Sequence, residues 1–205
     1  MTACPVQGGP RIAARLLGGL IPALLLGLVA VQQARSAGFD SAALMGLIAA
    51  HEKGRVSFVE TRHLALLDAP LESSGELIYT PPDRLERHTL KPREESAILD
   101  GDTLTLIRDG RTRALPLSDY PQIALLTDSL RAVLGGDLER LERSYTLALA
   151  GTPETWMLDL LPKDPQLTPG LRRIHLVGSG GRLERMDMIQ TNGDRSSLQI
   201  GEPRP

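Results

Sequence analysis

Cysteine is almost absent from this sequence of 205 residues, which contains a single one, Cys4. It precedes an N-terminal apolar run that we interpret as a signal peptide, so we expect the mature chain to have none. A chain without cysteine forms no disulfide, holds no thiolate-bound metal and uses no cysteine nucleophile. Aromatic residues make up only 3% of the sequence, which argues against stacking platforms for bases or sugars.

Basic runs are also lacking. The chain has 23 basic and 25 acidic residues and a formal net charge of −2. The first 36 residues hold three of the arginines and no acidic residue, so the remainder is more acidic than the whole. A weakly acidic domain without a basic patch is a poor binder of nucleic acid.

The N-terminus has the three parts of a secretory signal peptide. Arg11 and Arg15 precede an uncharged apolar run over residues 16–31, and small residues follow at 34–38. This order predicts export, with cleavage after Ser36, Ala37 or Gly38. Retention as an anchor is the alternative, because the run approaches the lower limit of about 17 residues for a spanning helix. We therefore expect a signal peptide at 1–36, a single domain at 37–205 and a periplasmic location in a bacterial cell.

Two segments of the mature chain have helical periodicity. Residues 41–53 follow a capping residue, Asp40 or Ser41, and end at Gly54. Residues 121–134 start at Pro121, which suits the first helical turn, and end at a pair of glycines. Residues 137–143 could add a short helical turn.

Most of the remaining chain alternates with the period of two that is typical of strands. The predicted strands are residues 55–64, 75–80, 84–90, 94–100, 103–108, 144–149, 155–161, 172–177, 182–190 and 195–200, with a bulge near Arg185. Turn sequences such as Asp109-Gly110 and Asn192-Gly193 separate them and favour tight hairpins. Short strands joined by hairpins indicate an antiparallel meander.

The strands have one apolar face, and only two predicted helices are available to cover it. The fold class that we expect is α+β and mostly β, a strongly curved antiparallel sheet, or incomplete barrel, with helices over its concave face. The space under the helices could be a packed core or a cavity. The periodicity alone does not choose between them.

The order of motifs resembles the outer-membrane lipoprotein carrier (LolA-like) family. The likeness covers most of residues 40–200, and its motifs are listed here in chain order: Phe58, the GELIY strand at 75–79, Pro82-Asp83, PREES at 92–96, DGDTL at 100–104, the W-x-L-x-L-x-P strand at 156–162, RIHL at 173–176 and NGDRS at 192–196.

This resemblance implies an incomplete barrel with a helical lid over an apolar cavity that carries acyl chains across the periplasm. It also implies no catalytic residue and no cofactor, and transient partners in the inner and outer membranes. The family has an arginine, which helps to hold the lid, immediately before the proline that ends its second strand. Here that position is Pro81, which marks a divergent member.

We hypothesise that ten apolar side chains surround acylated cargo, with ordinary core packing as the alternative for each of them. The lid would contribute Leu47, Leu126 and Leu130, and the sheet Leu77, Tyr79, Leu104, Leu106, Trp156, Leu158 and Leu160. The leading function is a monomeric periplasmic carrier of a lipoprotein or other lipidic cargo. A lipid-sensing regulatory domain of the same fold is the alternative. The cargo, the membrane partners and the direction of transport stay open.

Catalytic signals are weak. The histidines are dispersed without the spacing of metal ligands. The sequence Gly178-Ser179-Gly180-Gly181 lacks the order of a nucleophile elbow and is better explained as a hairpin turn. Asp100, Asp102 and Asp194 fall short of a calcium site. A hydrolase based on Ser179 is the third and weakest hypothesis.

Overall fold

The computed structural model describes residues 38–51, 54–164 and 170–203. Within them, all strands belong to an 11-stranded antiparallel sheet that does not close into a barrel. The predicted signal peptide at 1–36 lies outside the described residues and stays a prediction. The predicted fold class is confirmed.

The sheet consists of two meanders that meet in its middle. Its spatial order is β6-β5-β4-β3-β2-β1-β11-β10-β9-β8-β7. The strands are β1 (Arg55–His63), β2 (Leu71–Thr80), β3 (Arg84–Lys91), β4 (Glu95–Asp100), β5 (Thr103–Arg108), β6 (Arg111–Pro116), β7 (Tyr145–Thr152), β8 (Thr155–Pro162), β9 (Leu171–Ser179), β10 (Arg182–Gln190) and β11 (Arg195–Pro203). The first meander is β1 to β6 and the second is β7 to β11. The first strand of the first meander, β1, pairs with the last strand of the second, β11, and this pairing joins the two halves.

Local chemistry explains the tight connections. Asp109 and Gly110 both have positive φ, 51° and 71°, as a two-residue hairpin turn between twisted strands requires. That turn leads into β6, a strand that the sequence analysis did not predict. Arg111 and Arg113 are exposed there and Pro116 ends the strand, and such features are tolerated at a sheet edge, where pairing is needed on one side only.

Three α-helices and a 3₁₀ turn complete the described fold. They are α1 (Ser41–Ala50), η1 (Leu117–Asp119), α2 (Pro121–Gly135) and α3 (Leu138–Ser144). The carboxylate of Asp40 caps α1 by accepting from Ala43 N at 2.8 Å, and Asp137 caps α3 in the same way. Gly136 ends α2 with φ of 71°. An added Cβ there would lie 2.4 Å from Met45 O, so this glycine also lets α1 approach α2 closely.

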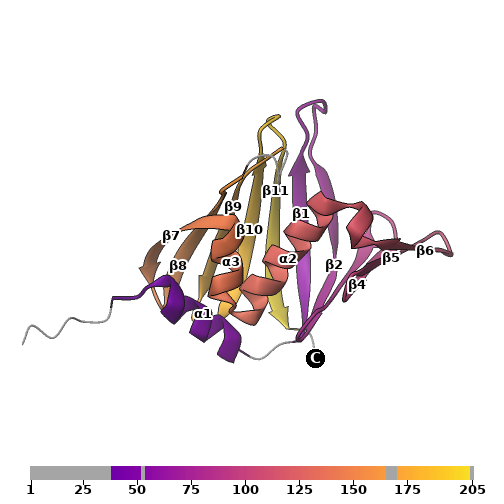
Figure 1. Ribbon diagram of the computed structural model, residues 1–205. Helices are drawn as coiled ribbons and strands as arrows, with labels where there is room; N and C mark the ends of the chain where they lie inside the picture. The colour runs from indigo at the N-terminus through magenta and orange to yellow at the C-terminus, as the bar shows by residue number, and fades with distance from the viewer. Residues whose placement is uncertain (1–37, 52–53, 165–169, 204–205) are drawn as a thin grey trace, which may run out of the picture. The chain divides into compact units, whose positions relative to one another are not determined.

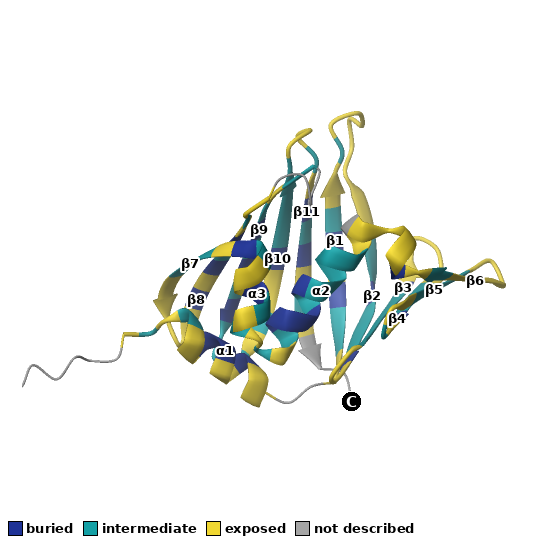
Figure 2. Ribbon diagram, in the orientation of Figure 1, coloured by how far each residue is buried: buried dark blue, intermediate teal, exposed yellow. Residues whose placement is uncertain are grey.

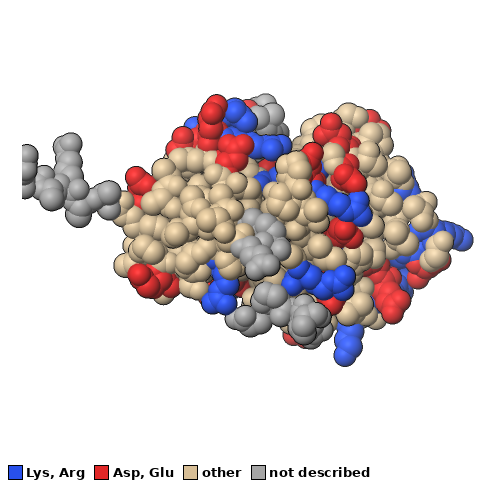
Figure 3. Space-filling model, turned by 90° about the horizontal axis from the view of Figure 1, so that it is seen from below, with Lys and Arg blue, Asp and Glu red and all other residues tan. Residues whose placement is uncertain are grey.

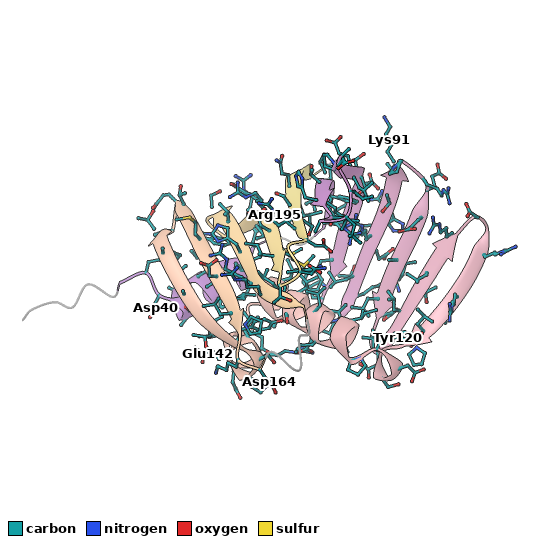
Figure 4. The ribbon with its side chains drawn as sticks, turned by 90° about the horizontal axis from the view of Figure 1, so that it is seen from above. Asp40, Lys91, Tyr120, Glu142, Asp164 and Arg195 are labelled. Carbon is teal, nitrogen blue, oxygen red and sulfur yellow. The ribbon has the colours of Figure 1, made fainter. Side chains whose placement is uncertain are left out.

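The helices lie against one face of the sheet (Figure 1). The view from above shows the sheet bending around them, with Asp40 and Tyr120, which precede α1 and α2, toward opposite edges (Figure 4). The buried positions concentrate where α1, α2 and α3 meet the strands of the second meander (Figure 2). The core therefore sits mainly on the β7 to β10 side.

Several predicted bounds differ from the structure. β2 begins at Leu71 rather than at residue 75, because residues 71–74 continue to pair with β1. α1 ends at Ala50 with His51 as its C-cap, and the predicted extension to residue 53 leads into positions outside the described residues. The turn anticipated at 137–143 is α3, and the bulge near Arg185 is present as a register shift between Leu183 and Arg185.

Candidate ligand-binding cavity

A cavity of about 860 Å³ lies under α2, within the 300–1,000 Å³ range that is typical of small-molecule sites. Apolar side chains form most of its wall, and a few charged residues join them. The residues of α2 and of the first meander that line it are Arg55, Val56, Leu77, Ile78, Tyr79, Leu85, Glu86, Arg87, Ala97, Leu99, Leu104, Thr127, Leu130, Val133 and Leu134. The second meander contributes Gly181, Arg182, Leu183, Glu184, Met186, Leu198, Ile200 and Gly201, and the C-terminal end of α1 and the chain after it contribute Ile48, His51 and Gly54.

Cross-strand register explains why these side chains share one wall. Tyr79 pairs with Leu85, Leu85 with Leu99, and Leu99 with Leu104. Directly opposed residues of an antiparallel sheet point to the same face. Four strands therefore present a continuous apolar row to the interior.

Four of the predicted site residues line this cavity: Leu77, Tyr79, Leu104 and Leu130. The first three come from β2 and β5, and Leu130 comes from α2. The structure thus brings lid and sheet positions together around one space. Their contact with a ligand stays a prediction.

Trp156, Leu158 and Leu160 lie elsewhere, in the solid core of the second meander. Each is at most 1% exposed, and none lines the cavity. The helices fill this half of the concave face, and the Trp156 ring rests on Gly178, the residue paired with it. The sequence left open whether the space under the helices is a packed core or a cavity. The structure has both: the half of the concave face on the second meander is packed, and the half on the first meander borders a cavity.

The other three predicted residues also lie outside the lining. Leu126 packs against the buried core, and Leu106 is half-buried on β5. Leu47 is 38% exposed, because α1 turns Leu44, Met45 and Ile48 inward instead. Seen from below, an area without Lys, Arg, Asp or Glu covers the part of the surface where α1 lies (Figure 3).

A polar cluster interrupts the apolar wall, and the sequence analysis did not identify it. Arg87 Nη2 donates to Glu60 Oε2 at 2.7 Å and to Ser73 Oγ at 3.1 Å. The Arg87 guanidinium also lies over the Phe58 ring, 4.2 Å from its centroid. The alternation of β3 could have identified Arg87. Side chains two residues apart on a strand point to the same face, so Arg87 faces inward if Leu85 does.

Polar contacts attach α2 to both halves of the structure. Ser129 Oγ donates to Tyr145 Oη on β7 at 2.9 Å, and Arg140 Nε on α3 donates to Asp128 Oδ1 at 2.8 Å. Toward the first meander, Arg131 Nη2 donates to the carbonyl of Gly101, in the β4–β5 turn, at 2.5 Å. Arg131 is 6% exposed, and the sequence analysis overlooked it because its partner is a backbone atom.

Burial raises the pKa of two tyrosines near these attachments. For Tyr79, loss of water is the main cause and the nearby Asp83 adds to it. For Tyr145, burial raises the pKa and the hydrogen bond from Ser129 opposes the rise. Both phenols are therefore held in the neutral form that an apolar interior favours.

The catalytic and metal-binding candidates are dispersed. Among the described residues, no group of three or more His, Cys, Asp or Glu is arranged to hold a metal ion. Ser179 is the last residue of β9, directly before the hairpin turn in which the sequence analysis placed it, and its Oγ donates to Glu184 Oε1 at 2.6 Å. His175 Nδ1 lies 2.7 Å from Asp159 Oδ1 on the neighbouring strand. Among the described residues, no helix combines the length and the apolar character needed to cross a membrane.

Comparison with known proteins gave one family match. Residues 33–201 match the model of the family described as "Outer membrane lipoprotein carrier protein LolA-like". No curated protein matched the chain.

Similar solved structures have low sequence identity to this chain. A LolA superfamily protein from Nitrosomonas europaea is 12% identical, with a TM-score of 0.42 over 82% of this chain and 95% of that one. A putative outer membrane lipoprotein-sorting protein domain from Vibrio parahaemolyticus is 11% identical, with a TM-score of 0.44 over 82% and 91%. A chain in the MucA/MucB complex of Pseudomonas aeruginosa is 14% identical, with a TM-score of 0.41 over 82% and 59%. These likenesses carry no argument about function.

Proposed function

Because this chain belongs to the LolA-like family of outer membrane lipoprotein carrier proteins, we propose that it is a periplasmic carrier of acylated cargo. The cargo is a lipoprotein or another lipidic molecule, and its acyl chains occupy the cavity under α2. The carrier accepts cargo from an inner-membrane donor and delivers it to an outer-membrane acceptor. It acts as a monomer, without cofactor and without catalysis.

The observation that supports this proposal is the apolar cavity of about 860 Å³ between α2 and the first meander. Water disfavours each exposed methylene by roughly 0.8 kcal/mol, so a 16-carbon chain costs on the order of 12 kcal/mol to expose. A preformed apolar space removes most of that cost.

Blocking the cavity tests the proposal. Leu77→Trp adds bulk to the cavity wall and should abolish binding of a fluorescent fatty acid analogue or of an acylated peptide. Val59→Trp is the matched control, because Val59 lies on the neighbouring strand and is half exposed. It should bind the probe as the unmodified protein does. Equal binding by both variants, or no binding by the unmodified protein, would contradict the proposal.

Native mass spectrometry of protein purified from its own periplasm identifies the cargo, and a transfer assay separates the two functions that use such a cavity. A carrier releases its acylated molecule to acceptor membranes. A lipid-sensing regulatory domain keeps its ligand and changes its affinity for a protein partner. Retention of bound lipid in the presence of acceptor membranes would favour the sensor.

A further inference from the structure

The Glu60–Arg87 pair is an unusual feature inside an apolar concave face. Glu60 is only 7% exposed, and Arg87 lines the cavity. Charged groups are costly to bury unless they are paired and hydrogen-bonded. Arg87 lies on the cavity wall and is held there by Glu60, which is outside the lining, and this position points to a role in contact with cargo.

The guanidinium of Arg87 is held in one orientation. Its face rests on the Phe58 ring, and its Nη2 bonds to Glu60 and Ser73. Its Nε contacts Thr89 Oγ1 at 3.4 Å. Among the described residues, Nη1 has no hydrogen-bond partner, so an oriented donor remains available to a guest.

The positive charge of the Arg87 guanidinium is already balanced by the Glu60 carboxylate. Glu60 Oε2 lies 2.7 Å from Arg87 Nη2, so the pair presents hydrogen-bonding capacity with no net charge. A guest with an uncharged acceptor leaves the site neutral. A guest carboxylate or phosphate brings a second negative charge close to Glu60, in surroundings that screen charge poorly.

We propose that the Glu60–Arg87 pair selects cargo in which the acyl chain is joined to an uncharged acceptor, an ester or amide carbonyl or a hydroxyl, and rejects free acids. Arg87 donates to the acceptor, and Glu60 cancels the positive charge that would otherwise attract anions. This inference rests on the proposed function, because it names the chemical class of guest that the cavity takes.

The test compares two guests with the same chain, monopalmitoylglycerol and palmitate, at pH 8 and below their micellar concentrations. Each displaces a fluorescent acyl probe, and the measured quantity is the ratio of the two affinities. The unmodified protein should favour the ester. Equal or tighter binding of palmitate by the unmodified protein would overturn the inference without any variant.

Variants that change the charge give the sharper result. Glu60→Gln leaves Arg87 unbalanced and should shift the ratio toward palmitate by at least about tenfold, since one unit charge is removed within a few ångströms. Arg87→Gln leaves Glu60 unbalanced and should shift the ratio away from palmitate. The double variant is uncharged again and should return to the ratio of the unmodified protein.

Asp187→Asn is the matched control. Asp187 also pairs with an arginine, Arg185, at 3.1 Å, but it alternates with the inward-facing Met186 and so lies on the outer face of β10. It should not change the ratio. A ratio in Glu60→Gln equal to that of the unmodified protein would overturn the inference. Failure of the unmodified protein to bind either guest would instead overturn the proposed carrier function.

Discussion

The leucine side chains of this protein differ in how far they are buried, and burial determines how much each contributes to stability. Leu158 is 0% exposed in the core, whereas Leu66 in the β1–β2 loop is 97% exposed. Leu158→Ala should lower the free energy of unfolding by about 2–5 kcal/mol, because it leaves a cavity in a packed region. Leu66→Ala should change it by less than about 0.5 kcal/mol. Urea unfolding of both variants measures this, and equal effects would contradict the assigned core.

We expect Tyr145 to make the stability of the fold decrease at alkaline pH. Burial raises the pKa of this phenol in the folded state, whereas an unfolded tyrosine ionises near pH 10. Above about pH 10 unfolding therefore releases a proton, and stability decreases until the folded pKa is reached. The steepest contribution of one proton is about 1.4 kcal/mol per pH unit.

Tyr145→Phe should flatten that alkaline decrease. It should also cost about 1 kcal/mol at neutral pH, because the hydrogen bond with Ser129 is lost. Tyr120→Phe, at an exposed position, is the control and should keep the slope of the unmodified protein. Denaturant titrations between pH 8 and pH 11 measure both, and an unchanged slope in Tyr145→Phe would disprove the assignment.

At the scale of elements, we expect Arg131 to control how firmly α2 is held to the first meander. Its bond to the Gly101 carbonyl joins the helix to the β4–β5 turn, next to strands that line the cavity. Arg131→Met keeps apolar bulk and removes this bond. Release of a bound acyl probe should become faster, by up to about tenfold for the loss of roughly 1.4 kcal/mol.

Stopped-flow dilution of the loaded protein measures the release rate. Arg143→Met is the matched control, because within the described part of the chain Arg143 on α3 forms only an exposed 3.4 Å pair with Glu139, a kind of ion pair that contributes little to stability. An unchanged release rate in Arg131→Met would mean that the bond to Gly101 does not hold the helix closed.

Sequence patterns predicted the elements well because their signals are local. Asp40 at a helix start, Pro121 in a first turn and Asp109-Gly110 in a hairpin each act within a few residues. Alternation also assigned Leu77, Tyr79 and Leu104 to the inner face. These features needed no knowledge of distant parts of the chain.

Sequence patterns could not show which part of the interior is filled and which part is empty. They also could not show which polar residues far apart in the chain contact each other. Trp156 and Tyr79 have the same alternation, yet one lies under packed helices and the other lines open space. Which half of the face the helices fill depends on how α1, α2 and α3 pack together. The Arg131–Gly101 bond and the Glu60–Arg87 pair join residues 30 and 27 positions apart, and only the folded chain brings them together.

At the scale of the whole domain, the two meanders are unequally packed. Five large, almost completely buried side chains lie on β8 and β9: Trp156, Leu158, Leu160, Ile174 and Leu176. In β2 to β6, the only described hydrophobic residues classed as buried are Tyr79 and Leu99. Regions with few buried apolar contacts open at a lower free energy than the rest of a fold. This asymmetry suits the proposed carrier function, in which the domain opens to exchange its cargo.

Hydrogen exchange should resolve the two halves. Amides of β8 and β9 should exchange only with global unfolding, while those of β4 and β5 should exchange at least about tenfold faster through smaller openings. Monopalmitoylglycerol should slow exchange in β3 to β5 and α2, because a guest that binds the closed form stabilises it by about 2.7 kcal/mol at one hundred times its dissociation constant. Glycerol, which lacks the acyl chain, should leave the pattern unchanged. Uniform protection across both meanders would show that the cavity side does not open separately, and α2 could then not act as a lid.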